Sequence, residues 1–222
     1  MRALLPPLLI LAPAIAQAQD LPVMADGMII APPDCTALLT VQSEGCFVRN
    51  VMLCGDAKAP LMVTVQSNDR GMAIDTQDIG LQTLDVQDPS YGWSETLETV
   101  TDRFDVRVMV ATGVDTFDST ARDVDGVATR QLGERRLTGQ EVTIDSRQLQ
   151  IVHSTYRQMT DGMPDTEIEE IALYDPSGRF LLVERYFIDG AADPAVVMTP
   201  VDFISAADPG LMSAVPLYGC PQ

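Results

Sequence analysis

The sequence predicts a mainly β protein, built as a single antiparallel sheet that is curled or barrel-like and carries one or two short helices. Three observations lead to this prediction. Short runs rich in β-branched and aromatic residues follow one another along most of the chain. Turn-forming residues separate these runs at fairly even intervals. The runs do not alternate with long helical patterns, as they would in a parallel sheet.

The chain begins with the three parts of a secretory signal. Arg2 is positively charged, residues 4–15 are apolar and uncharged, and Ala16 and Ala18 are the small residues that a signal peptidase requires. An apolar stretch of about twelve residues is too short to span a bilayer core of about 30 Å. We therefore predict a cleaved signal peptide over residues 1–18 and a mature protein that is soluble in the periplasm.

Residues 19–45 are expected to form an irregular, Pro-rich N-terminal segment, because Pro22, Pro32 and Pro33 oppose helix formation. No Gly/Ser-rich or charged linker divides the rest of the chain, so residues 46–222 are predicted to form a single β-rich domain. Strands are expected over 46–54, 61–66, 72–76, 79–86, 114–121, 127–136, 140–145, 148–158, 167–174, 179–188 and 195–204.

The clearest single element is a hairpin around residues 175–178, which read Asp-Pro-Ser-Gly. Ile171 and Leu173 precede this segment, and Phe180 and Leu182 follow it. Proline at the second position of a turn and glycine at the fourth favour a tight turn between two apolar runs. The pattern therefore predicts antiparallel pairing of the flanking strands.

Residues 94–112 are the stretch that least resembles a strand. Apolar residues recur there at spacings of three and four, Ser94 is a suitable N-cap, and Gly113 is suitable just beyond a helix C-terminus. The valines at positions 106, 108 and 110 alternate instead, which is typical of a strand. We expect one helix within residues 94–112, with its limits left open.

The four cysteines predict two disulfides, since an even number in an exported chain is typical of structural bridges. If residues 46–54 form one extended strand, Cys46 and Cys54 lie roughly 26 Å apart, which excludes a bond between them. Two pairings remain: Cys35–Cys46 with Cys54–Cys220, or Cys35–Cys54 with Cys46–Cys220. We favour the first, because its long bridge would attach the C-terminus to the start of the sheet.

The formal net charge of −18 makes some partners improbable. Such an excess of acidic residues repels phosphate backbones and anionic lipid surfaces, so binding to nucleic acid is not expected. No apolar stretch after the signal is long enough to predict a membrane span.

Candidate catalytic residues are few. His153 is the only histidine, and no G-x-S-x-G nucleophile motif accompanies it, so a packed or hydrogen-bonded histidine is the preferred interpretation. Carboxylate pairs of the glycosidase kind could be drawn from the predicted hairpin, although an acidic protein places such pairs on solvated faces by chance. These carboxylates are Glu167, Glu169, Glu170 and Glu184. We therefore predict no catalytic residue.

Two further patterns resemble metal sites. The segment 123–126 is a fragment of a calcium loop without the remaining ligands, and a hairpin turn is the preferred interpretation. Met24 with Met28, and Met159 with Met163, have a spacing that could suit copper(I), although the assisting histidines are missing. We predict no metal site and no cofactor.

Cys35, the segment 46–54 from Cys-Phe-Val to Cys54, and the ending MSAVPLYGC together resemble a group of uncharacterised exported bacterial proteins with four cysteines. The resemblance covers most of the mature chain and implies no activity. The layout of consecutive strands is also similar, at the level of architecture, to the periplasmic lipoprotein carriers. That resemblance implies a half-barrel that shelters acyl chains beneath a helical lid.

Two functions are therefore expected from different classes. The first is a non-catalytic binding or carrier module of the cell envelope, holding an apolar small molecule or lipid inside the curled sheet. The second is an accessory subunit that engages an envelope protein through an exposed apolar surface. A deep apolar pocket would favour the first, whereas a filled interior with an outward apolar patch would favour the second. A hydrolase with an unrecognised site is the third alternative.

Overall fold

The computed structural model describes residues 21–220, so the predicted signal peptide over 1–18 lies outside the described residues. The described chain is mainly β, with a two-stranded sheet and a thirteen-stranded antiparallel sheet. The strands are β1 (Val23–Ala25), β2 (Met28–Ile30), β3 (Cys35–Ser43), β4 (Phe47–Cys54), β5 (Leu61–Asn68), β6 (Gly71–Gln77), β7 (Thr83–Asp88), β8 (Trp93–Asp102), β9 (Val114–Asp123), β10 (Ala128–Ile144), β11 (Arg147–Thr160), β12 (Thr166–Asp175), β13 (Phe180–Ile188), β14 (Val196–Val197) and β15 (Pro200–Ser205).

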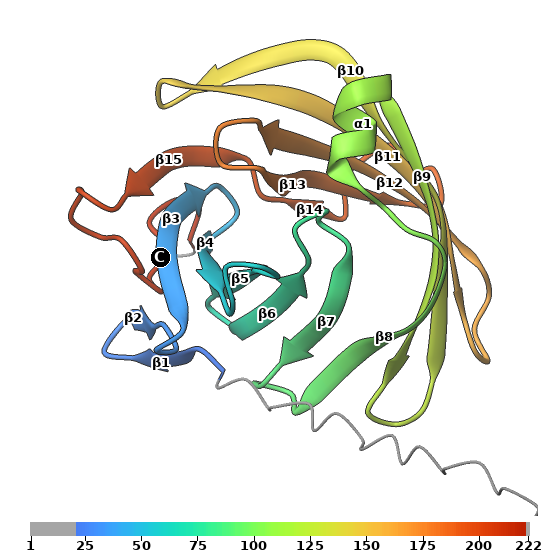
Figure 1. Ribbon diagram of the computed structural model, residues 1–222, viewed down its shortest axis with the longest axis horizontal. Coiled ribbons are helices and arrows are strands. Elements are labelled where there is room, and N and C mark those ends of the chain that lie inside the picture. The colour runs from blue at the N-terminus through green and yellow to red at the C-terminus, as the bar shows by residue number, and fades with distance from the viewer. Residues whose placement is uncertain (1–20, 221–222) are drawn as a thin grey trace, which may run out of the picture.

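The large sheet is a meander in which each strand from β3 to β14 pairs with the next, and β15 returns to pair with β3. Figure 1 shows that this sheet curls around its own concave face. The two end strands, β14 and β15, do not pair with each other. The prediction of one curled antiparallel sheet is confirmed, and the curl does not close into a barrel.

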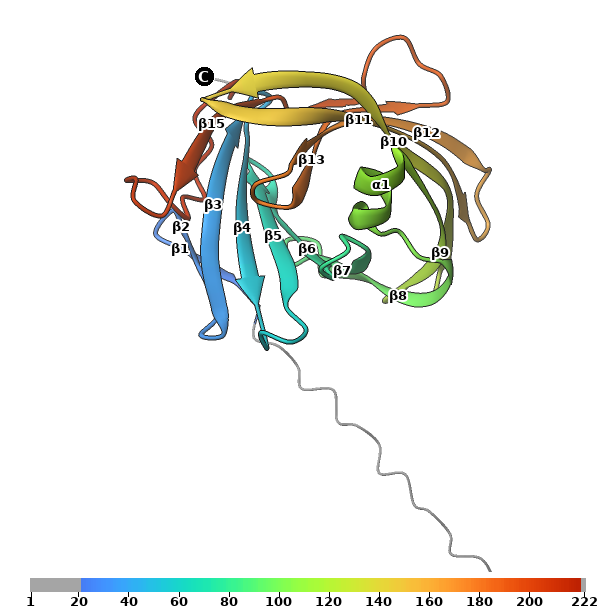
Figure 2. The ribbon, with the colours of Figure 1, turned by 45° about the horizontal axis from the view of Figure 1, so that its top comes forward.

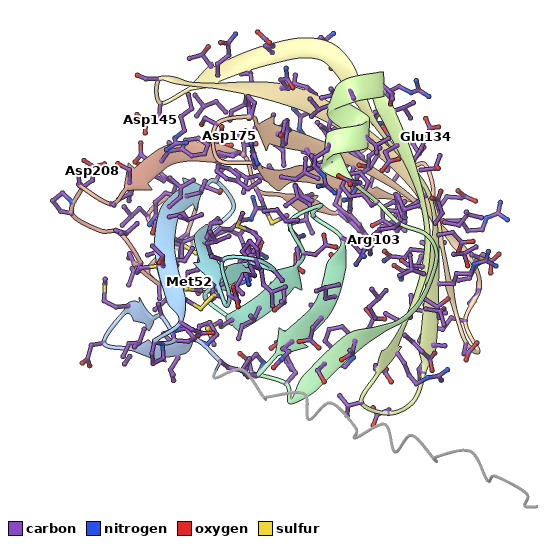
Figure 3. The ribbon with its side chains drawn as sticks, viewed as in Figure 1. Met52, Arg103, Glu134, Asp145, Asp175 and Asp208 are labelled. Atoms are coloured by element: carbon purple, nitrogen blue, oxygen red, sulfur yellow. A yellow bond between two sulfur atoms is a disulfide. The ribbon has the colours of Figure 1, made fainter. Side chains whose placement is uncertain are left out.

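The long hairpin of β10 and β11 reaches across to β15. The Asp145 carboxylate at its tip accepts a hydrogen bond from the Phe203 backbone at 2.9 Å, and the Arg147 guanidinium lies 5.4 Å from the Phe203 ring centroid. Arg147 also forms an ion pair of 2.7 Å with Asp175, whose side chain is 2% exposed. Figure 3 shows Asp145 and Asp175 on this side of the molecule, where the tip closes over one end of the curl.

Apolar residues fill this end of the concave face. The cluster joins strands β3, β4 and β5 directly to β11, β12, β13 and β15, so the two sides of the curl meet there. Its buried members are Leu39, Val41, Val51, Met62, Leu149, Leu173, Phe180, Leu182 and Phe203. At the other end of the curl the two sides separate, and helix α1 (Val106–Thr112) lies between them (Figure 2).

The expectation of a helix within 94–112 is confirmed, but the helix is shorter than the pattern predicted. Its N-cap is Asp105, whose side chain accepts from the Arg107 backbone at 2.9 Å, and not Ser94. Gly113 ends it in the left-handed conformation with φ of 89°, as expected. Residues before the helix form β8, so the helical spacing of Leu97 and Val100 did not indicate a helix there.

The disulfides use the pairing that we did not favour. Cys35 lies directly opposite Cys54 in the β3–β4 ladder, with 4.0 Å between their Cα atoms, and the two residues are bonded. Cys46, in the turn between these strands, is bonded to Cys220. The predicted pairing of Cys35 with Cys46 and of Cys54 with Cys220 was wrong. Residues 35–43 form strand β3, and its pairing with β4 places Cys35, at the start of this hairpin, beside Cys54 at its end.

The same strand corrects the expectation that 19–45 is irregular, since this segment contains β1, β2 and β3. β3 was missed because it contains polar residues that are nevertheless fully buried, such as Thr40 and Gln42. The C-terminal segment covers them: Gln42 exchanges hydrogen bonds with the backbones of Val215 and Leu217 at 3.1 and 3.0 Å. Within residues 21–220, no helix is both long and apolar enough to cross a membrane.

Candidate functional site

A cavity of about 660 Å³ occupies the open end of the curl, between the concave faces of β4–β9 on one side and β10–β13 on the other. Its size is within the range of cavities that hold drug-sized ligands. Apolar side chains form most of its wall, among them Ile74, Leu81, Leu84, Val86, Leu97, Phe104, Phe117, Ala121, Leu181, Leu182, Val183, Tyr186, Val196 and Met198.

Strand alternation places these side chains inside. On β10, Thr129, Gln131 and Arg135 line the cavity at every second residue, and Gly133 holds the remaining inward position. On β9, Phe117, Ser119 and Ala121 follow the same rule. The inward positions of these two strands therefore add a few polar side chains to the mostly apolar wall, a combination that is typical of a ligand cavity.

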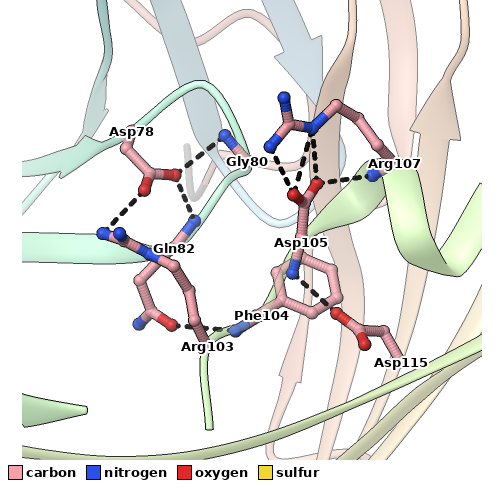
Figure 4. A network of polar contacts seen from close by, with 8 residues as sticks. All are labelled: Asp78, Gly80, Gln82, Arg103, Phe104, Asp105, Arg107 and Asp115. Atoms are coloured by element: carbon pink, nitrogen blue, oxygen red, sulfur yellow. Dashed lines mark hydrogen bonds and ion pairs between the residues drawn. The ribbon is translucent and has the colours of Figure 1, made fainter.

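A network of polar contacts fixes the segment between β8 and α1 at the cavity wall (Figure 4). The Asp78 carboxylate accepts from the Gly80 and Gln82 backbones at 2.8 and 3.1 Å and pairs with Arg103 at 2.8 Å. The Gln82 side chain accepts from the Phe104 backbone at 3.2 Å. These contacts hold the Phe104 ring, which is 2% exposed, against the cavity from a loop position.

Arg49 extends from β4 to the cavity wall and is 4% exposed. Its Nε donates to Gln66 at 2.9 Å, and its Nη2 donates to the Val183 carbonyl at 2.6 Å and contacts the Met198 sulfur at 2.9 Å. Burial lowers the pKa of the Arg49 guanidinium to about 10, so the group stays charged at neutral pH. None of the ion pairs found within residues 21–220 includes Arg49.

Asp75 lies on β6 and also lines the cavity. Burial raises the pKa of its carboxyl to about 7, against the opposing influence of the Arg135 charge and of hydrogen bonds from Gln77 and Thr83. The Gln77 amide donates to Asp75 at 2.8 Å. A carboxyl group with such a pKa changes between its protonated and ionised forms near neutral pH.

Arg135 and Glu170 bring two more charged groups to the wall. The Arg135 guanidinium lies over the Phe104 ring at 4.6 Å, a cation–π arrangement. Glu170 accepts a hydrogen bond of 2.9 Å from the Tyr156 hydroxyl. Burial, together with this carboxylate, raises the pKa of Tyr156, which therefore stays protonated and acts as a donor.

Each of these four charged residues has one buried polar atom with no hydrogen-bond partner among the described residues. The atoms are Arg49 Nη1, Asp75 Oδ1, Arg135 Nε and Glu170 Oε2. Three serine hydroxyls make up the rest of that set. Buried polar atoms without a hydrogen-bond partner are costly, and the gathering of these four around one cavity marks it as the candidate functional site.

The structure separates the candidates that the sequence offered. His153 lies on β11 between Val152 and Ser154, which face the interior, so its side chain is on the outer face and bonds Glu169 at 2.9 Å. Glu167 pairs with Arg157 at 2.8 Å in solvent. Glu184 is buried beside Thr199, at 3.2 Å. Among the four carboxylates, only Glu170 lines the cavity.

The segment that resembles a calcium loop has a structural explanation. Segment 123–126 is the turn between β9 and β10. The Asp123 carboxylate stabilises this turn, because it accepts hydrogen bonds from the Asp125 and Val127 backbones at 3.0 and 2.8 Å. Met24 and Met28 lie in the small sheet, whereas Met159 lies at the end of β11 in the large one. Residues 21–220 contain no group of three or more His, Cys, Asp or Glu side chains arranged to hold a metal ion.

Comparison with family models, with curated proteins and with solved structures gives no match to this chain. The site is therefore defined by its own geometry. Sequence reasoning missed Arg49, Asp75 and Arg135. A signal was present for the first two, since each is a lone charge at an inward position of an apolar strand.

Proposed function

We propose that the protein is an exported, non-catalytic binding or carrier module that holds an amphiphilic small molecule in the cavity of its curled sheet. The observation that carries the proposal is the combination of an apolar wall with four incompletely bonded charged groups. An apolar wall binds a hydrocarbon body, whereas buried charged groups need polar partners that such a ligand would bring.

Export is supported by the covalent structure. Two disulfides join Cys35 to Cys54 and Cys46 to Cys220, and such bridges persist in oxidising compartments. The predicted signal over residues 1–18 and a periplasmic location belong to this proposal. The likeness to periplasmic lipoprotein carriers, with acyl chains sheltered inside the curl, also belongs to this proposal.

The non-catalytic part of the proposal concerns His153, the residue that the sequence offered as a catalytic base; Asp75 and Glu170 do line the cavity, and the proposal gives them the role of polar contacts to the ligand. His153 is on the outer face of β11 and engaged with Glu169, on the opposite side of the sheet from the cavity. Acid–base chemistry on a bound ligand requires a group within hydrogen-bond reach of it.

A neutral fluorescent probe, N-phenyl-1-naphthylamine, tests the proposal. We expect saturable binding with one site per chain, and loss of binding in Ser119→Phe, whose ring would fill the cavity from β9. Thr120→Phe is the matched control, because the neighbouring residue of a strand points to the other face. Absence of saturable binding to the wild-type protein, or equal binding by Ser119→Phe, would refute the proposal.

An exposed apolar surface favours accessory-subunit function as a second candidate. Val23 and Ile30 are paired across β1 and β2 and are 59% and 54% exposed. Substitution of Val23 and Ile30 by Ser should leave probe binding intact and abolish co-purification of an envelope partner, if this surface is an interface. Unchanged co-purification would show that this surface is not the interface with the partner.

A further inference from the structure

Arg49 differs from most of the other arginines of this acidic protein. Eight of the twelve arginines within residues 21–220 (all except Arg49, Arg70, Arg135 and Arg179) each form an ion pair with one Asp or Glu side chain at the surface or its margin. Arg49 is far more buried than most of them, yet its acceptors are an amide, a carbonyl and a thioether. A buried guanidinium with only neutral acceptors has an uncompensated charge.

Met198 is the weakest of these acceptors. Its sulfur lies 2.9 Å from Arg49 Nη2, although a thioether is a poor acceptor for a charged donor. The methionine side chain is flexible and lines the same cavity, so it can move aside at little cost. An anionic oxygen in its place would bond Nη2 and reach Nη1, which has no partner within residues 21–220.

Planar oxyanions match this pair of donors. Both Nη atoms of a guanidinium can donate in parallel to two oxygens of a carboxylate or phosphate, and such charge-assisted bonds are about twice as strong as neutral ones. The apolar residues beside Arg49, such as Leu182 and Val183, would then contact the body of the ligand.

We infer that the cavity ligand is a single-chain amphiphile with an oxyanion head group, and that Arg49 anchors this head in place of the Met198 thioether. The inference rests on the proposed function, since it names the ligand class of the same cavity. It also assigns a direction to the ligand: the head lies at β4 beside the 196–199 segment, and the chain extends toward Phe104 and Phe117.

Displacement of N-phenyl-1-naphthylamine by dodecyl ligands tests the head group without any variant. We expect dodecanoate or dodecyl phosphate to displace the probe at a concentration at least tenfold lower than dodecanol, and dodecyltrimethylammonium to be weaker than dodecanol. The carboxylate and phosphate arms identify which oxyanion fits better. Equal displacement by dodecanoate, dodecyl phosphate and dodecanol would overturn the inference and leave the proposed function standing.

Variants then locate the head. Arg49→Gln should abolish the preference for anions while the neutral probe still binds, and Arg185→Gln, which removes an arginine paired with Glu184 outside the cavity, should keep it. Met198→Leu keeps an apolar side chain and removes the competing thioether, so dodecanoate should bind severalfold more tightly. Should Arg49→Gln fail to fold, the Met198→Leu result decides: unchanged or weaker dodecanoate binding would overturn the assignment of Arg49. Failure of the wild-type protein to bind the neutral probe would instead refute the proposed function.

Discussion

Phe117 and Tyr156 contact each other across the backbone of Gly133, with 5.7 Å between their ring centroids. Gly133 is opposite Phe117 on one side and Tyr156 on the other in the β9–β10–β11 register. A β-carbon at Gly133 would lie 2.3 Å from the Tyr156 β-carbon and 2.2 Å from the Thr155 carbonyl oxygen. Only glycine therefore fits at this position, between the two aromatic side chains that line the cavity.

Gly133→Ala should destabilise the protein by about 2 kcal/mol, because the added methyl group forces the Tyr156 backbone or β10 to move. Urea denaturation measures the change. Leu132→Ala, at an exposed neighbouring position on the opposite face, is the control and should cost less than about 1 kcal/mol. A Gly133→Ala variant as stable as the control would contradict the steric argument.

Asp75→Asn should change the pH dependence of stability. The pKa of Asp75 is about 7 in the folded protein and near 3.8 when unfolded, so between these values the folded state binds the proton more tightly. The free energy of unfolding of the wild type therefore decreases as the pH rises through this window. The variant lacks this titration, so its advantage should grow from near zero at about pH 4 to about 2 kcal/mol at about pH 8, after discounting the shift for solvent screening.

Urea denaturation across this pH range provides the measurement for Asp75→Asn. Asp69→Asn, in the exposed turn between β5 and β6, serves as the control and should follow the wild-type curve. A constant difference between Asp75→Asn and the wild type at every pH would show that Asp75 is not the group that titrates.

Loss of the Cys46–Cys220 bridge should cost more than loss of Cys35–Cys54. The sequence separations are 174 and 19 residues, and the chain-entropy model gives about 5 and about 3 kcal/mol. Thermal melts of the two double-serine variants measure the difference. A larger loss from the Cys35–Cys54 variant would mean that the entropy of the unfolded chain does not dominate.

His153→Ala should leave both stability and probe binding close to the wild type. The side chains of His153 and Glu169 are 42% and 48% exposed, and a hydrogen bond between such exposed groups contributes less than about 1 kcal/mol. Denaturation and probe titration check the two parts separately. If the variant folds normally but loses its biological activity in a complementation assay, the outer face of β11 is a functional site and the non-catalytic proposal is wrong.

Much of the sheet could be predicted because its signals are local. The turn at 175–178 is observed with the Asp175 carboxylate accepting from the Ser177 and Gly178 backbones at 2.7 and 3.1 Å. Such a turn depends on four adjacent residues, and the flanking runs then form β12 and β13. Gly113 was likewise recognisable as a helix end from its immediate neighbours.

The features that sequence reasoning missed depend on distant residues. The C-terminal segment covers the polar side chains of β3, so the sequence of β3 does not resemble that of a buried strand. Because β3 was not predicted, the wrong disulfide pairing was chosen. Arg49 belongs to the cavity only because the curl brings Val183 and Met198 to it. A pattern within one strand cannot contain information about partners more than a hundred residues away.

The return of β15 to β3 has a consequence for the order of folding. Strands β3 to β14 pair with sequence neighbours, so these hairpins can form one after another along the chain. β3 still has one row of unpaired backbone groups until Pro200–Ser205 pairs with it, because this second partner lies more than a hundred residues later in the chain. A chain truncated before residue 200 should therefore retain most of its hairpins and yet self-associate through β3, as uncovered strand edges do.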